Sequence, residues 1–266
     1  MAETYKHGVY LSETATALQP VNQVANPVVA VGTAIQGPIN EPTLITGFSD
    51  FVQTFGYKGS YSHFTLEEVA YVFFQLYNVS PVIMINVLNP ETHCKNGDKT
   101  LTGMTTDQTI KTWIVPGTLV ATSGSNTLVE GTDFTFKDGV FHMKSQANVV
   151  DDTVNLTYKI IDGERVSNAN IIGGVNSSTG KESGLAAIEN VYPRLGLVPG
   201  LIICPKFSAV PEVALAMAAR ASDINGCFKS LAICDITTEA PTLAVPYDIK
   251  ENPTADLATG DIAIAR

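Results

Sequence analysis

Two uninterrupted apolar runs constrain the fold of this chain more than any other feature of its sequence. They are PVVAVGTAI at residues 27–35 and PVIMINVL at residues 81–88. A strand that is apolar on both of its sides must be covered on both faces of its sheet. A shorter apolar segment, residues 43–46, and two helix signals lie between the runs. Strands that alternate with helices predict an α/β (α+β) core with a mixed, mostly parallel sheet.

The two helix signals between these runs have different origins. The first helix is predicted to begin with Ser49 as its N-cap and to end at Gly56. The second begins with the sequence Thr65-Leu66-Glu67-Glu68, which has the spacing of a capping box. Its apolar residues recur at the spacing of one helical face: Leu66, Val69, Ala70 and Phe73.

The pattern changes after Pro90, and no helical period appears from Thr92 to about Ile171. The pair Asp138-Gly139 is typical of a two-residue hairpin turn. Four apolar residues alternate with polar ones, as in a half-buried strand: Val154, Leu156, Tyr158 and Ile160. We therefore expect residues 92–170 to form an inserted small all-β domain.

Strands and helices alternate again after this insert. A helix is predicted over residues 184–192, and strands are predicted over residues 201–204 and 231–236. The helix between these two strands carries Pro211 in its first turn and continues to Ala221. The core is thus predicted in two parts, residues 21–91 and residues 171–266.

Residues 1–20 are predicted to form an extended N-terminal arm. Four residues alternate along one side of it: Tyr5, His7, Val9 and Leu11. A lone strand leaves its N–H and C=O groups unpaired, so it needs the edge of a sheet. The polar segment between Pro20 and Pro27 is expected to let the arm leave the body of its own subunit. These four residues are therefore the expected inter-subunit contacts of the arm.

The charge of the chain limits the classes of partner. The net charge of −10 repels phosphate backbones, so we expect no direct contact with nucleic acid. No apolar stretch approaches the ~18 residues of a membrane span and no signal peptide is apparent, so we expect no membrane insertion and no export. Charged residues make up only 16 % of the chain. Such a surface suits contacts with copies or partners, although a compact monomer rich in Ser, Thr and Asn has the same composition.

Two segments resemble nucleotide-binding motifs, but they lack the flanking structure or the spacing that such motifs require. Gly32-x-Ala34-x-x-Gly37 follows a strand as a dinucleotide fingerprint does, but Pro38 follows it and no helix begins there. The segment GVNSSTGKES, residues 174–183, departs from the spacing of a phosphate loop and is predicted to be a flexible polar loop. We expect no cofactor.

The cysteines and histidines do not form a recognisable site. Four cysteines show no C-x-x-C spacing, and Cys204 and Cys234 are expected to be buried, reduced thiols. The four histidines are scattered, and His93-Cys94 is predicted to be a solvated loop pair. The sequence therefore predicts no catalytic residue, no cofactor-binding residue and no metal ligand, and we expect that the protein is not an enzyme.

The order of five segments resembles that of contractile phage tail sheath proteins, a family that includes the sheaths of R-type tailocins and related contractile injection systems. The segments are YKHGVYLSE (5–13), VVAVGTAIQGP (28–38), PTLITGFSDFVQTFG (42–56), YPRLGLVPGLIICP (192–205) and SLAICDI (230–236). Nearly all of the chain outside residues 92–170 takes part. Their order and spacing carry the resemblance, since no single segment is as specific as a metal motif.

The resemblance implies a structural subunit with an inserted domain on its outer side. Such subunits polymerise helically around a tail tube, and arms exchanged between subunits keep them tethered during contraction. The implied partners are other sheath subunits, the tail tube protein, and the baseplate and tail terminator proteins. The implied location is the virion tail or a tailocin particle, assembled in the bacterial cytoplasm. Sheath proteins continue beyond the strand that matches residues 231–236, and this chain lacks that continuation, so we expect this 266-residue form to be mainly monomeric.

Two other classes of protein fit the same pattern of elements. A doubly wound α/β nucleotide-binding enzyme with a β lid would place its ligand near Gly32 or Pro205, at the carboxyl ends of strands. A decoration or adhesion protein would bind a surface through residues 92–170.

Overall fold

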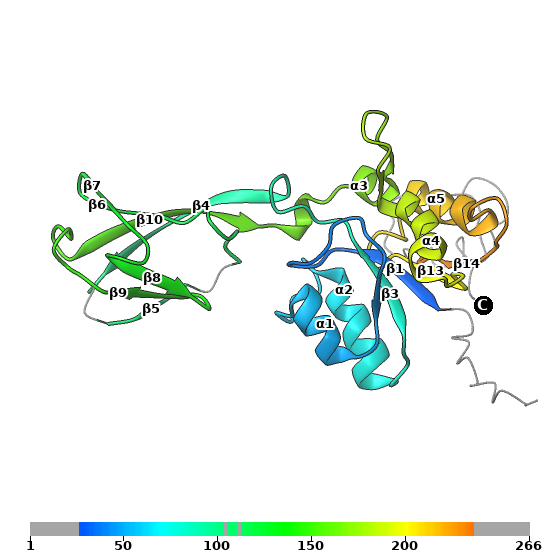
Figure 1. Ribbon diagram of the computed structural model, residues 1–266, viewed down its shortest axis with the longest axis horizontal. Coiled ribbons are helices and arrows are strands. Elements are labelled where there is room, and N and C mark those ends of the chain that lie inside the picture. The colour runs from blue at the N-terminus through cyan, green and yellow to red at the C-terminus, as the bar shows by residue number, and fades with distance from the viewer. Residues whose placement is uncertain (1–26, 104–105, 111–112, 237–266) are drawn as a thin grey trace, which may run out of the picture.

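The computed structural model shows an elongated molecule with an α/β core at one end and a β domain at the other (Figure 1). The structure describes residues 27–103, 106–110 and 113–236. In this part of the chain, no helix is both long and apolar enough to cross a membrane.

The core is built on a five-stranded sheet in the order β14-β13-β1-β3-β2. Four strands are parallel, and β2 runs antiparallel to β3 at one edge. This confirms the prediction of a mixed, mostly parallel sheet. The strands are β1 (Val28–Gly32), β2 (Thr43–Ile45), β3 (Val82–Asn86), β13 (Leu201–Ile203) and β14 (Leu231–Ile233).

Helices cover both faces of this sheet. One face carries α1 (Phe48–Phe55), α2 (Thr65–Ala70) and the π-helical turn η1 (Tyr71–Leu76), which pack on residues such as Ala30 and Met84. The other face carries α3 (Asn168–Ile172), the 3-10 helix η3 (Gly184–Asn190), α4 (Val191–Leu195) and α5 (Pro211–Ser222), which pack on residues such as Val31 and Ile85. Side chains alternate between the two faces along each strand, which explains the continuous apolar runs of β1 and β3.

Two predicted helix starts are wrong. Helix α1 begins at Phe48 after Gly47, not after Ser49. The carboxylate of Asp50 accepts a hydrogen bond from the backbone N–H of Thr46 at 2.9 Å. This bond holds the backbone in place just before the first turn of α1. Gly56 ends this helix as predicted.

The predicted capping box of α2 does not form either. Phe64 is the N-cap residue, and no side chain makes a capping bond within the helix. The hydroxyl of Thr65 instead accepts a hydrogen bond from the backbone of Thr33, and Glu68 is exposed. The apolar face of this helix is buried as predicted, including Leu66, which has no exposed surface.

The helix α5 agrees closely with the sequence pattern. It begins at Pro211, carries Glu212 in its first turn and Arg220 in its last turn, and ends at Ser222. An acid near the N-terminus and a base near the C-terminus both interact favourably with the helix dipole. The helix predicted over residues 184–192 divides into η3 and α4.

The described strands of the insert form two antiparallel sheets, in the orders β4-β10-β6-β7 and β5-β9-β8. The strand β10 buries Val154, Leu156 and Tyr158 in alternation as predicted, whereas Ile160 is half-buried and Ile161 is buried. Asp138 and Gly139 both have positive φ in the turn between β8 and β9, which confirms the predicted hairpin. The strands are β4 (Cys94–Thr102), β5 (Gln108–Thr109), β6 (Val120–Ser123), β7 (Asn126–Leu128), β8 (Phe134–Lys137), β9 (Val140–Met143) and β10 (Thr153–Ile161).

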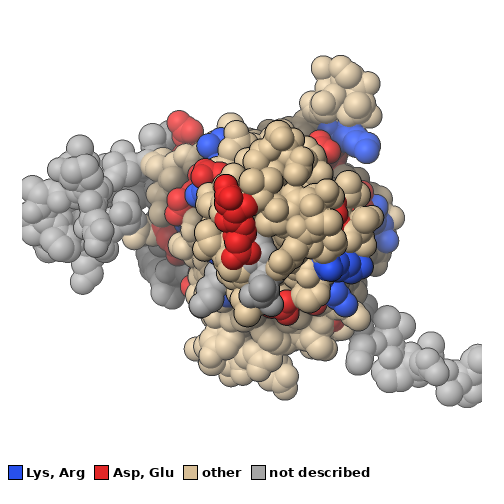
Figure 2. All heavy atoms as spheres, turned by 90° about the vertical axis from the view of Figure 1, so that its left-hand side faces the viewer, with Lys and Arg blue, Asp and Glu red and all other residues tan. Residues whose placement is uncertain are grey.

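The free end of the insert presents both signs of charge. Figure 2 shows Asp and Glu side chains grouped near the middle of this face, with Lys and Arg toward its sides. At its other end the insert continues into the 3-10 helix η2 (Gly163–Arg165) and then α3, and Val166 and Ile171 belong to the buried cluster of the core.

Candidate functional site at the carboxyl edge of the central sheet

The predicted contact residues of the arm, Tyr5, His7, Val9 and Leu11, lie outside the described residues. The site that the structure does describe is the carboxyl edge of the sheet, where α/β folds place their ligands. This edge also meets the insert.

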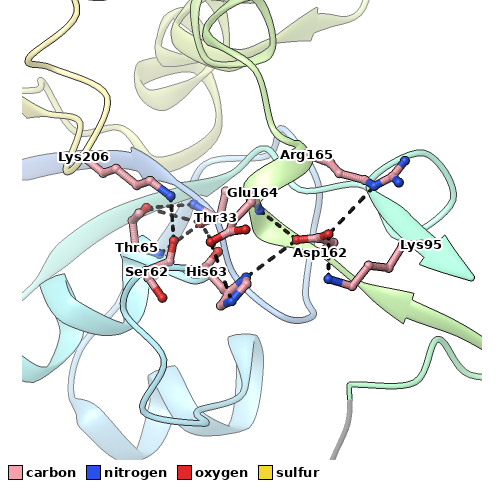
Figure 3. A network of polar contacts seen from close by, with 9 residues as sticks. All are labelled: Thr33, Ser62, His63, Thr65, Lys95, Asp162, Glu164, Arg165 and Lys206. Atoms are coloured by element: carbon pink, nitrogen blue, oxygen red, sulfur yellow. Dashed lines mark hydrogen bonds and ion pairs between the residues drawn. The ribbon is translucent and has the colours of Figure 1, made fainter. Parts of the chain in front are cut away.

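The carboxyl end of β1 is closed by two buried hydroxyl groups (Figure 3). The backbone N–H of Thr33 donates to Oγ1 of Thr65 at 3.1 Å, and the N–H of Thr65 donates to Oγ1 of Thr33 at 3.0 Å. The N–H of Leu66 donates to the carbonyl of Thr33 at 3.1 Å. These N–H groups at the start of α2 are therefore not free to bind a phosphate group.

Gly32 has a packing role at the same place. A Cβ atom at this position would lie 2.3 Å from Oγ1 of Thr65. The glycine that resembles the first position of a dinucleotide fingerprint is thus required by the contact between β1 and α2.

Asn86 closes the carboxyl end of β3, and its side chain is buried. Its Oδ1 atom accepts hydrogen bonds from the N–H groups of Ala34 at 2.9 Å and Leu88 at 3.0 Å, and its Nδ2 atom donates to the carbonyl of Gln36 at 3.3 Å. Sequence reasoning missed this residue. The available signal was a single amide side chain at the end of the apolar run of residues 81–88.

The ends of β13 and β14 are closed in a similar way. The Ser208 hydroxyl donates to Oδ2 of Asp235 at 2.7 Å, and Sγ of Cys204 donates to the carbonyl of Val31 at 3.2 Å. Burial raises the pKa of the Cys204 thiol, so this sulfur stays protonated and is a poor nucleophile. Cys204 and Cys234 are both buried and free, as predicted.

The segment that imitates a phosphate loop forms a small hairpin. Strands β11 (Gly174–Val175) and β12 (Glu182–Ser183) pair antiparallel at its ends, where the sequence predicted only a loop. Oδ1 of Asn176 accepts the N–H groups of Ser178 at 2.9 Å and Thr179 at 3.0 Å. These donors bond within the loop and do not point at a ligand.

A cluster of charged side chains joins the core to the insert (Figure 3). Asp162, at the end of β10, lies 3.2 Å from Nζ of Lys95 on β4 and 3.9 Å from Nε of Arg165. Its Oδ1 atom accepts the N–H of Glu164 at 3.2 Å and lies 3.7 Å from Nδ1 of His63, which belongs to the core.

The pKa of Asp162 reflects opposing effects. Burial alone would raise the pKa, but the hydrogen bond from Lys95, the Glu164 N–H and the charges of Lys95 and His63 together lower it. Asp162 is therefore ionised at neutral pH. Its negative charge attracts the cationic side chains at the junction, by which we mean the contact between the insert and the core.

Trp113 adds an aromatic contact to the same junction. Its ring lies 5.1 Å from the His63 ring and 4.8 Å from the Phe64 ring, edge-to-face in both cases. The carbonyl of Trp113 accepts the N–H of Ile161 at 2.7 Å. This side chain from the insert thus packs directly on the loop that precedes α2.

His63, Asp162 and Glu164 are close enough to hold a metal ion together, since one ligand atom from each lies within 4.8 Å of the others. The geometry fits a metal poorly. Asp162 faces Nδ1 of the imidazole while Glu164 lies 3.9 Å from Nε2, so the carboxylates approach different ring nitrogens. Lys95 already neutralises Asp162 and would repel a cation. The arrangement is suited to an ion-pair cluster between two parts of the chain.

The prediction that His93 is solvated is wrong. His93 is buried, its Nδ1 atom accepts the N–H of Asn89 at 2.9 Å, and its carbonyl accepts the N–H of Asp162 at 3.0 Å. Burial lowers the pKa of His93. The neutral imidazole serves as a hydrogen-bond acceptor. It holds the backbone in place where the chain passes from the core into the insert.

The comparisons with known proteins show a weak similarity to a solved structure. No family model matches the sequence, and no curated protein matches it. Among solved structures, a sheath tail protein from Listeria innocua matches with a TM-score of 0.30 and 10 % identity. The match covers 78 % of this chain and 47 % of that chain, so this chain spans about half the length of that protein. A TM-score this low establishes neither a shared fold nor a shared function.

Proposed function

We propose that this chain is a structural subunit of a contractile tail sheath, which polymerises helically around a tail tube and contracts to drive the tube through a target cell envelope. The observation that carries the proposal is the order of the five segments between residues 5 and 236 that resemble sheath proteins. The mixed α/β core with a projecting β insert supports it (Figure 1).

A non-enzymatic role is part of the proposal. The carboxyl ends of β1 and β3, where a nucleotide would bind in a doubly wound enzyme, are filled by Thr33, Thr65 and Asn86. Contraction needs no hydrolysis, because a metastable lattice releases energy when its subunits reorient as rigid bodies and form new contacts.

The proposed partners are other copies of the subunit, the tail tube protein, and the baseplate and terminator proteins of the tail. Heterologous contacts between identical copies build open helical assemblies. A strand added to a neighbour's sheet supplies directional main-chain hydrogen bonds that tolerate reorientation of the rest of the subunit. The proposed location is the virion tail or a tailocin particle.

Electron microscopy of the product of the intact gene, expressed with and without its neighbouring tail genes, tests the proposal. We expect tubes of fixed helical symmetry. The double variant Val9→Asp, Leu11→Asp should abolish them, whereas Tyr10→Asp, Ser12→Asp on the opposite side of the arm should reduce them much less. Monodisperse monomers under all conditions, or a stoichiometric bound nucleotide, would contradict the sheath assignment.

A further inference from the structure

A small recess opens where the chain leaves the carboxyl end of β3 for the insert. Its volume is about 300 Å³, which is at the lower end of the range for small-molecule pockets. The loop after β1, the loop after β3, helix α3 and strand β12 all contribute to its wall. The polar residues of this wall are Asn40, Asn89, Thr92, His93, Asn170 and Ser183. The recess therefore lies at the edge of the sheet where α/β folds place their ligands.

None of the described residues in the wall carries a charge. The titratable group among them is the imidazole of His93, and burial lowers its pKa, so it is neutral at neutral pH. An anion in this recess would lose its hydration without meeting a counter-charge. The net charge of the whole chain, −10, also opposes an anion. The recess is thus suited to an uncharged molecule.

The three asparagine side chains of the wall all use their oxygen atoms within the chain. Oδ1 accepts a backbone N–H group at 2.9 Å in each case: that of Gly184 for Asn40, that of Glu91 for Asn89 and that of Ser167 for Asn170. No described residue accepts a hydrogen bond from the Nδ2 atom of any of the three. Each side chain is held by its oxygen, and its NH₂ group remains a donor at the wall of the recess.

Two hydroxyl groups of the wall complement these donors. The Ser183 hydroxyl donates to the carbonyl of Gly174 at 3.2 Å, and the Thr92 hydroxyl donates to the carbonyl of Asn89 at 3.5 Å. A hydroxyl that donates its own proton still has lone pairs, so both oxygens can accept a proton from a ligand. Three donors and two acceptors around an uncharged space match a molecule with several hydroxyl groups.

His93 keeps the wall in place. It is 8 % exposed, its Nδ1 atom accepts the backbone N–H of Asn89 at 2.9 Å, and its imidazole hydrogen bonds to the Asn170 side chain. Two of the three amide donors are therefore fixed before a ligand arrives. Such preorganisation reduces the entropy that binding would otherwise lose.

We infer that this recess binds a small uncharged polyol, such as a monosaccharide or a sugar alcohol. The NH₂ groups of Asn40, Asn89 and Asn170 donate to its hydroxyl oxygens, and the hydroxyl oxygens of Thr92 and Ser183 accept its protons. No aromatic side chain is among the described residues of the wall other than His93, so the affinity comes from hydrogen bonds. A dissociation constant on the order of 1–10 mM is expected from five such bonds. This site does not depend on the proposed function.

Heteronuclear NMR of the full chain tests the site, with glucose and mannitol as polyol probes and sodium sulfate and sodium acetate as anion probes. We expect the side-chain NH₂ signals of Asn40, Asn89 and Asn170 to shift and saturate with at least one polyol. The NH₂ signal of Asn155, which is exposed on β10, should not shift. Local saturation separates binding from the general exclusion of polyols from protein surfaces. Shifts that stay linear up to about 100 mM of both polyols, or saturation by an anion alone, would overturn the inference.

Two variants test the wall directly. Thr92→Val removes one acceptor and should weaken polyol binding by about fivefold. Its control is Thr106→Val, because the Thr106 hydroxyl donates to the carbonyl of Gly103, also three residues earlier, at 3.4 Å, outside the recess. Ala169→Leu enlarges an exposed wall residue and should abolish binding. Circular dichroism verifies that the variants are folded. Unchanged affinity in folded Thr92→Val and Ala169→Leu would refute binding at this site.

Discussion

Thr33 and Thr65 bind each other reciprocally: the hydroxyl oxygen of each accepts the backbone N–H of the other, at 3.1 and 3.0 Å. The Thr33 hydroxyl also donates to the carbonyl of His63 at 2.8 Å. The pair thus joins the end of β1 to the start of α2 and satisfies backbone groups that would otherwise be buried without partners.

Replacement of Thr33 by Val should lower the free energy of unfolding by about 1–3 kcal/mol, because the buried N–H of Thr65 and carbonyl of His63 lose their partner. Urea denaturation measures this change. The control Thr157→Val, at an exposed position of β10, should change it by less than about 0.5 kcal/mol. Equal effects of the two substitutions would mean that the reciprocal contact contributes little.

Glu67 should be far more important for stability than its neighbour Glu68. Glu67 is fully buried, and its carboxylate accepts the N–H groups of Lys58, Gly59 and Ser60 at 2.7–3.1 Å. Glu67→Ala should therefore lower the free energy of unfolding by about 2–3 kcal/mol.

The matched control is Glu68→Ala, at an exposed position of the same helix. Its effect should stay within about 0.5 kcal/mol. Thermal unfolding of the two variants side by side makes the comparison. A larger effect of Glu68→Ala would show that the predicted capping box forms in solution after all.

Asp162 should stabilise the junction in a pH-dependent way. Its pKa is lowered below its ordinary value of 3.8, so the folded chain binds the proton more weakly than the unfolded chain. The stabilisation is therefore present above that value and is lost as the pH falls toward the lowered pKa. At neutral pH, Asp162→Asn should reduce the free energy of unfolding by about 1–2 kcal/mol.

Urea denaturation across a pH series checks this prediction. The difference between the wild-type chain and Asp162→Asn should shrink as the pH falls below about 4. Glu164→Gln, a change at an exposed carboxylate of the same cluster, should have a small effect at every pH. A difference for Asp162→Asn that does not change with pH would refute an electrostatic role.

The insert should be removable if the deletion respects its pairing register. Lys95 and Ile160 are directly opposite each other in the β4–β10 ladder. Replacement of residues 96–159 by Asn-Gly should therefore close a tight hairpin and leave a folded core.

A wider deletion, which joins Asn89 to Ile171 through a Gly-Ser bridge, also removes Ile161 and Val166 from the buried cluster of the core. The core should remain soluble in both variants, but the wider deletion should be less stable by about 2–5 kcal/mol. Circular dichroism and thermal unfolding compare the two. Loss of folding in the narrow deletion would show that the core needs contacts from the insert, such as that of Trp113 with Phe64.

The sequence by itself determined the features that depend on local preference and periodicity. The apolar runs predicted β1 and β3, Pro211 marked the start of α5, and Asp138-Gly139 marked the hairpin between β8 and β9. Each of these follows from residues close together in the chain, because backbone conformation and side-chain alternation act over a few residues.

Only the tertiary structure decided which hydrogen-bond partners the polar side chains have. The pattern of Thr65 and Glu68 is that of a capping box, yet Thr65 pairs with Thr33, which is 32 residues away. His93 lies in a polar stretch, yet it is buried next to Asn170 of α3. A hydroxyl, amide or imidazole group can bond to many partners. The one that it finds depends on which segments the packing of apolar faces brings together, and short-range sequence patterns do not contain that information.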